Sequence, residues 1–300
     1  MLYYLSVNLV TCLCVILSVA YFTLLERKTL GYTQTRKGPN KVGSFGLLQP
    51  LSDALKLFVK EKLVIVDSNI LLFYIIPSFS FTLSLFIWYL LPSFYTMKFV
   101  LYGLMLFFCV SALNVYGTMM AGWASNSKYA FLGAMRAAAQ TISYEVMMII
   151  LLLFPSIIIS SLCWNKAMNG FPILMLIPLL MIWFTSTLAE TNRAPFDFAE
   201  GESELVSGFN IEYYGGLFAL LFLGEYMSIL FMAVSTTVWF FWVGNIFVFI
   251  SSILFVSIMF LLSRATFPRY RYDLLMMLCW KSFLPIALGA MVLSIISFML

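Results

Sequence analysis

Apolar residues run along this chain in long stretches separated by shorter polar segments. Each stretch has about 20 residues, which at a helical rise of about 1.5 Å per residue crosses a hydrocarbon layer roughly 30 Å thick. A helix satisfies all its backbone hydrogen bonds within its own segment, as a lipid environment requires. The pattern predicts an all-α integral membrane protein with about eight transmembrane helices, over residues 3–25, 70–91, 99–121, 137–162, 171–189, 214–234, 240–262 and 282–300.

The boundary between the sixth and seventh spans has the weakest signal. Between residues 214 and 263 the only charged residue is Glu225. Length alone therefore places a break near Ser235–Thr237.

The first connection, residues 26–68, contains a second periodic pattern. Over residues 45–62, apolar side chains recur at i, i+3 and i+4, with Gln49, Asp53 and Lys60 among the polar residues on the opposite face. This pattern and the short length predict an amphipathic helix lying at the membrane interface. It is either a strut on the membrane surface or a lip that guides a lipid-like ligand.

Composition and charge support a single transmembrane domain over residues 1–300. Hydrophobic residues make up 63% of the chain and charged residues 10%. Lys98 and Lys166 lie in the second and fourth connections, whereas the other fifteen of the 17 basic residues lie in or beside the first, third, fifth and seventh. By the positive-inside rule, both termini face away from the side of synthesis. This rule also explains the net charge of +4 without a nucleic-acid partner.

The connection at residues 190–213 is unusually acidic. It holds six of the chain's 13 carboxylates and one of its 17 basic residues. If the chain is helical after Pro195, then Asp197, Glu200 and Glu204 share one face and Glu202 points away. Carboxylates this close titrate as a coupled set, which favours proton handling. A calcium site is the competing interpretation, but the EF-hand ligand pattern is absent.

Glu145 and Glu225 lie inside predicted spans, where a charge costs about 2.5 kcal/mol or more. Each is either paired or kept protonated by burial, or belongs to a proton relay. Glu190 and Glu212 extend the line of carboxylates from the acidic connection toward Glu225.

Several other chemistries find no support. The five cysteines lie apart in apolar runs, and the chain has no histidine, so we expect no metal site. Neither nucleotide-binding glycine motif is present. The charges that follow the first apolar run argue against a cleaved signal peptide. Any redox centre is expected on another chain.

Six segments together resemble the subunit 1 family of respiratory complex I, and the resemblance covers almost the whole chain. They are ERKTLGY (26–32), TRKGPNKVG (35–43), GWASNSKYA (122–130), AAAQTISYEV (137–146), LAETNRAPFDFAEGESELVSGFNIEY (188–213) and PRYRYD (268–273).

The resemblance implies a core membrane-arm subunit of proton-pumping NADH:ubiquinone oxidoreductase, with no independent catalysis by this chain. Ubiquinone is the implied substrate, and FMN and iron–sulfur clusters are implied on partner subunits. The implied partners are hydrophilic quinone-site subunits, antiporter-like membrane subunits and lipids. The residues implied at the ubiquinone path or junction are Glu26, Arg27, Arg36, Asp53, Arg193 and Arg269. Those implied in the proton relay are Glu145, Glu190, Asp197, Glu200, Glu202, Glu204, Glu212 and Glu225.

Other functions remain open at the level of the residues: the membrane subunit of a related proton-pumping hydrogenase, a self-contained carboxylate-based proton or cation transporter, or a structural anchor. The transporter is disfavoured because no inverted repeat is evident. The many methionines, phenylalanines and tyrosines fit an AT-rich organelle genome. The expected location is the mitochondrial inner membrane, with a bacterial plasma membrane as the alternative.

Overall fold

The fold is a bundle of long apolar helices. The computed structural model describes residues 2–61, 63–64, 68–92, 100–168, 177–197, 208–210, 212–241 and 243–299. Within these residues seven helices are long and apolar enough to cross a membrane, and no strand occurs. The long elements are α1 (Leu2–Thr33), α3 (Ile70–Ile87), α4 (Gly103–Ala124), α5 (Lys128–Ile159), α9 (Gly215–Phe240), α10 (Ile246–Thr266) and the continuous run of α11 (Tyr272–Met277), η5 (Leu278–Phe283) and α12 (Leu284–Met299).

The predicted fifth span corresponds to a shorter apolar helix, α7 (Ile177–Glu190). Residues 171–176 of the predicted span lie outside the described residues. Seven long helices and α7 together account for the predicted multi-pass all-α architecture. The remaining elements are short: η1 (Ser44–Gly46), α2 (Gln49–Val59), η2 (Trp88–Leu90), α6 (Trp164–Ala167) and η4 (Gly208–Asn210).

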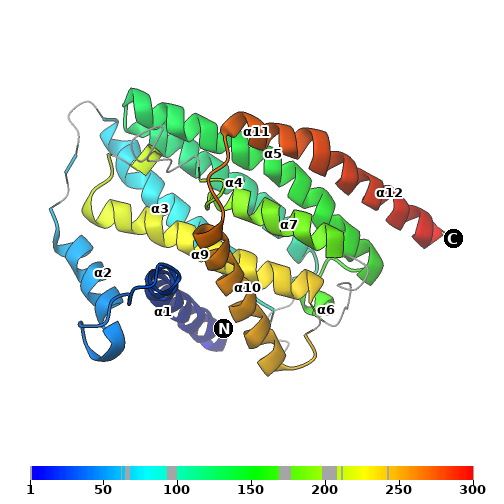
Figure 1. Ribbon diagram of the computed structural model, residues 1–300, viewed down its shortest axis with the longest axis horizontal. Helices are drawn as coiled ribbons and strands as arrows, with labels where there is room; N and C mark the ends of the chain where they lie inside the picture. The colour runs from blue at the N-terminus through cyan, green and yellow to red at the C-terminus, as the bar shows by residue number, and fades with distance from the viewer. Residues whose placement is uncertain are drawn as a thin grey trace.

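Helix α9 forms the centre of the bundle. It packs against α3, α10, α2 and α1, and every residue from Phe231 to Phe240 is buried. Around Phe231 the rings of Trp164 and Phe107 lie at centroid distances of 5.3 and 5.8 Å. In Figure 1, α3, α4, α5 and α9 run across the view, α2 lies at the left, and α6 and the C-terminus lie at the right.

The break predicted near Ser235–Thr237 is wrong, because α9 continues through these residues to Phe240. The hydroxyls of Ser235, Thr236 and Thr237 donate to carbonyls three residues earlier, at 2.7 to 2.8 Å. Because the helix satisfies these polar groups itself, it has no reason to end there. The chain becomes extended at Phe241, and α10 begins at Ile246.

Other boundaries also differ from the sequence patterns. Helix α1 continues to Thr33, so Glu26 and Arg27 lie within a helix. Helix α2 begins at Gln49 instead of residue 45, because Phe45 and Gly46 have positive φ angles and form a turn. The last span begins at Tyr272, well before residue 282.

Candidate functional site: a buried ion cluster and a polar cavity

Four elements bring a buried ion cluster together around Glu26 of α1. Its Oε1 accepts hydrogen bonds from Arg193 (2.9 Å) and from Arg264, and its Oε2 accepts one from the Tyr226 hydroxyl (2.7 Å). The Arg193 guanidinium also lies 4.3 Å from the centre of the Tyr226 ring. Only 3% of Glu26 is exposed, so the two guanidiniums and the hydroxyl replace its lost hydration. The cluster joins α1, α9, α10 and the segment after α7.

Two more ion pairs lie nearer the surface. Arg27 donates to Asp53 of α2 at 2.6 Å and so links α1 to the amphipathic helix. Arg269, which follows α10, lies 3.7 Å from the buried carboxylate of Asp197. The structure therefore pairs five of the six residues predicted for the quinone path or junction with an opposite charge, while Arg36 is exposed.

A polar cavity of about 40 Å³ lies on another side of α9. Glu190 and Glu225 contribute to its lining, and a cavity of this size has room for about three waters. Among the described residues the Oε2 of Glu190 is buried without a hydrogen-bond partner. The other lining residues are Ser80, Asn114, Gly117, Thr118, Thr191, Asn192, Leu221, Gly224 and Ser228.

The third intramembrane carboxylate, Glu145 of α5, is buried beside this region. The hydroxyl of Ser111 on α4 donates to its Oε1 at 3.0 Å. Glu145 and Glu190 are close enough to repel each other when both are charged. Three of the predicted relay carboxylates, Glu145, Glu190 and Glu225, are thus gathered around one part of the bundle.

Two short stretches of the chain each carry one residue that lines the cavity and one residue that bonds to Glu26. Glu225 lines the cavity and its neighbour Tyr226 bonds to Glu26. Likewise Glu190 lines the cavity and Arg193, three residues later, bonds to Glu26. Successive residues of a helix point about 100° apart, so α9 presents Glu225 and Tyr226 to different surroundings. Two partners of Glu26 therefore lie on the same backbone segments as Glu190 and Glu225.

The far end of the acidic connection is held by Tyr213. Its hydroxyl donates to the Ala121 carbonyl at 3.1 Å, and its ring stacks on Phe73 at a centroid distance of 4.3 Å. Burial raises the pKa of Tyr213 above its usual value, so the residue stays a neutral donor at physiological pH. Glu212 beside it is partly exposed. Glu200, Glu202 and Glu204 lie outside the described residues, and so does most of the helix predicted after Pro195.

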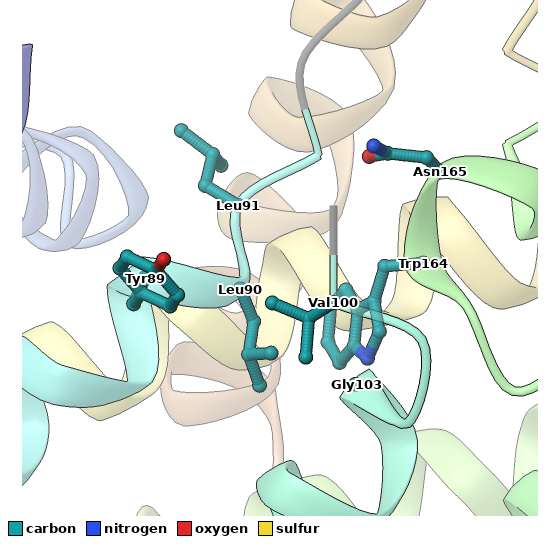
Figure 2. Close-up of a pocket in the computed structure, with 7 residues that line it drawn as sticks. All are labelled: Tyr89, Leu90, Leu91, Val100, Gly103, Trp164 and Asn165. Atoms are coloured by element: carbon teal, nitrogen blue, oxygen red, sulfur yellow. The ribbon is translucent and has the colours of Figure 1, made fainter. Parts of the chain in front are cut away.

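A second, smaller pocket of about 10 Å³ lies at the end of α3 and the start of α4. Figure 2 shows the residues that line it, which are Tyr89, Leu90, Leu91, Val100, Gly103, Trp164 and Asn165. None of the described residues that line it carries a charged side chain. No group of three potential metal-ligating side chains occurs among the described residues.

Sequence reasoning missed Tyr226, Arg264 and the neutral lining of the cavity. Arg264 carried a usable signal, because it is the first charge after the seventh apolar run. The only signal for Tyr226 in the sequence was its position next to Glu225, and tyrosine is too common in this chain for that to stand out. The asparagine, serine and threonine side chains of the lining are too frequent in membrane helices to stand out.

The architecture and the site define a class: multi-pass helical membrane proteins that keep ionised and polar groups inside the bundle. A family model described as NADH dehydrogenase matches residues 7–295. The chain is 51% identical to the NADH-ubiquinone oxidoreductase chain 1 of Aedes aegypti, over 94% of this chain and 92% of the relative. It is 49% identical to that of Artemia franciscana (96% of each chain) and 48% identical to that of Heterololigo bleekeri (97% and 96%). The chain belongs to this NADH dehydrogenase family.

Proposed function

We propose that this chain is a core membrane subunit of complex I that couples ubiquinone reduction to proton translocation. The observation that carries the coupling role is the double link between the Glu26 cluster and the polar cavity, made by the Glu225–Tyr226 and Glu190–Arg193 pairs. The names of the relatives and the family membership support the assignment of this chain to complex I.

In this proposal ubiquinone approaches along α1, α2 and α9. The residues that line or brace its path are Glu26, Arg27, Arg36, Asp53, Arg193 and Arg269. Electrons arrive from flavin and iron–sulfur clusters on hydrophilic partner subunits. Quinone reduction consumes two protons and creates transient negative charge. That charge weakens the hold of the guanidiniums on Glu26 and alters the electrostatics around the carboxylates.

The proton relay then runs from the acidic connection into the bundle and on toward antiporter-like subunits. Its proposed members are Asp197, Glu200, Glu202, Glu204, Glu212, Glu190, Glu225 and Glu145. The polar cavity supports this assignment, because waters in a cavity of about 40 Å³ can carry protons between Glu190 and Glu225. The proposed setting is the mitochondrial inner membrane, with the basic and acidic connections on the matrix side and both termini in the intermembrane space.

The first test is native electrophoresis of gently solubilised source membranes, with in-gel staining for NADH dehydrogenase activity and mass spectrometry of each band. The proposal expects this chain in a very large NADH-oxidising band that also contains iron–sulfur subunits. Recovery of the chain alone would favour a self-contained transporter. Recovery with hydrogenase subunits would favour the hydrogenase relative.

A further inference from the structure

One neutral side chain bridges the two ends of the segment that carries Glu190 and Arg193. Gln140 of α5 is fully buried, and its amide nitrogen donates to the carbonyls of Ala189 (2.8 Å) and Phe196 (2.9 Å). Its amide oxygen has no hydrogen-bond partner among the described residues. Both acceptors are backbone carbonyls, which cannot donate, so they fix which end of the amide faces them.

The two carbonyls bracket residues 190–195. Ala189 is the penultimate residue of α7, and Phe196 follows a tight turn in which the Arg193 amide donates to the Leu188 carbonyl (3.1 Å) and the Phe196 amide to the Arg193 carbonyl (2.8 Å). Within this turn Glu190 lines the polar cavity and Arg193 bonds to Glu26. The position of both charged side chains relative to α5 therefore depends on the same amide.

Helix α5 also carries Glu145, five residues after Gln140. The bond to Ala189 thus ties the helix that carries Glu145 to the end of the helix that carries Glu190. An apolar side chain of similar volume would fill the same space but would leave the Ala189 and Phe196 carbonyls without this donor, so the amide holds the turn as well as packing against it.

We propose that Gln140 is a positioning residue for coupling: it holds the turn at residues 190–195 so that Glu190 faces the cavity while Arg193 stays on Glu26. This inference rests on the proposed function. It assigns a role to an uncharged residue that takes up no proton and touches no quinone.

The test compares complex I preparations whose chain carries Gln140→Met or Thr141→Val. Methionine has nearly the length of glutamine but no donor. Thr141 is the matched control, because it is buried one residue away and, among the described residues, its hydroxyl bonds to carbonyls of its own helix, those of Ala137 and Ala138 at 3.1 Å. Quinone reduction, protons pumped per electron, and NADH oxidation by a hydrophilic artificial acceptor are measured on equal amounts of assembled complex.

We expect Gln140→Met to lower kcat for quinone reduction about tenfold and to reduce the protons pumped per electron, with KM for quinone and artificial-acceptor activity unchanged. Thr141→Val should leave all four quantities near the unmodified values. If Gln140→Met behaves like Thr141→Val, the inference is wrong. If Gln140→Met prevents assembly, Gln140→Asn replaces it, since asparagine keeps the amide but is one methylene too short to reach both carbonyls.

A double variant separates positioning from general damage. If Gln140 acts through Glu190, adding Gln140→Met to Glu190→Gln should cost little beyond Glu190→Gln alone, whereas independent effects multiply. Multiplying effects would overturn the inference. If Glu190→Gln alone leaves pumping and quinone reduction unchanged, Glu190 does not belong to the relay. That result would contradict the proposed function, and the single variant reveals it independently of the double variant.

Discussion

At the scale of single residues, the unusual feature is that the buried carboxylates of the described bundle have different kinds of surroundings. Glu26 has two arginines, whereas Glu145 accepts from the Ser111 hydroxyl and Glu190 faces a cavity. A charged group at the centre of a membrane costs about 2.5 kcal/mol or more. Neutral partners and a few waters lower that cost only in part. Such groups are suited to gain and lose a proton.

Replacing Glu225 by glutamine removes the titratable group and keeps the size of the side chain. We expect Glu225→Gln to lower coupled quinone reduction and proton pumping at least tenfold, because a relay stops at a group that cannot ionise. Ser235→Ala on the same helix is the control, since in the part of the chain that the structure describes that hydroxyl bonds within α9, to Met232. Pumping is measured by acidification outside sealed vesicles. Normal pumping in Glu225→Gln would exclude this residue from the relay.

The contacts of the Glu26 cluster predict which of two substitutions, Glu26→Gln or Tyr226→Phe, destabilises the protein more. Glu26→Gln leaves Arg193 and Arg264 facing an amide, and breaking a buried pair from one side costs about 3–5 kcal/mol. Tyr226→Phe removes one hydrogen bond to a carboxylate, worth about 1.5–3 kcal/mol. Glu26→Gln should therefore lower the melting temperature of the assembled complex and its quinone reductase rate more than Tyr226→Phe does. The reverse order would mean that the hydroxyl, and not the ion pairs, holds the cluster.

The sequence was sufficient to nominate Glu145 and Glu225, because a lone acid in a long apolar run has no routine explanation. It was not sufficient to nominate Gln140 or Tyr226. Their roles arise from contacts with segments 49 to 200 residues away, and no local pattern records such contacts. The pairing of Glu26 with Arg193 also depends on the packing of α1 beside the end of α7.

At the scale of elements, small residues allow the helices to approach closely. A Cβ built on Gly122 of α4 would lie 2.2 Å from the Ala134 Cβ of α5 and 3.0 Å from the Ala130 carbonyl oxygen. Ser111 on α4 reaches Glu145 on α5 across the same pair of helices. Close packing of α4 on α5 therefore serves the environment of Glu145 as well as the stability of the bundle.

Gly122→Val tests this packing. The added atoms overlap α5, and overpacking of this kind costs about 1–3 kcal/mol. We expect less assembled complex on native gels and a lower melting temperature for what assembles. Gly289→Val on α12 is the matched control, because a Cβ there meets nothing within 4 Å. If Gly122→Val gives as much assembled complex and as high a melting temperature as Gly289→Val, then α4 and α5 tolerate a wider separation.

Element boundaries were the least predictable part of the fold, for reasons that particular residues explain. Helix α9 passes through Ser235, Thr236 and Thr237 because their hydroxyls bond within the helix. The last helix begins early because Leu275 and Cys279, four residues apart, are buried while Asp273 and Lys281 stay exposed. Hydropathy alone treats these polar residues as breaks.

At the scale of the whole molecule, the bundle has two ends, one with α2 and the other with α6 and the C-terminus. Helix α2 is at the left of Figure 1, and α6 and the C-terminus are at the right. Lys41 precedes α2 and Lys166 belongs to α6, and both are exposed. The proposed orientation places Lys41 in the matrix and Lys166 in the intermembrane space.

Labelling by a membrane-impermeant amine reagent tests that orientation. In mitoplasts with an intact inner membrane, we expect modification of Lys166 and protection of Lys41, and the reverse in inverted vesicles. Peptide mass spectrometry reads out both sites in one sample, so each lysine is the control for the other. Modification of Lys41 in mitoplasts would invert the proposed topology and place the carboxylate connection on the opposite side.

Arg36 is an exposed basic residue just beyond the end of α1. It lies in a turn after α1, where its amide donates to the Gly31 carbonyl at 2.9 Å, and its side chain is exposed in the isolated chain. A guanidinium presented by a fixed turn suits a quinone head group or an acidic partner surface. We expect Arg36→Ala to raise KM for a short-chain quinone several-fold while NADH oxidation by an artificial acceptor is unchanged. Lys37→Ala, which removes the neighbouring exposed charge, is the control. Equal loss of both activities in Arg36→Ala would assign this residue to assembly, because a defect confined to the quinone path spares electron entry from NADH.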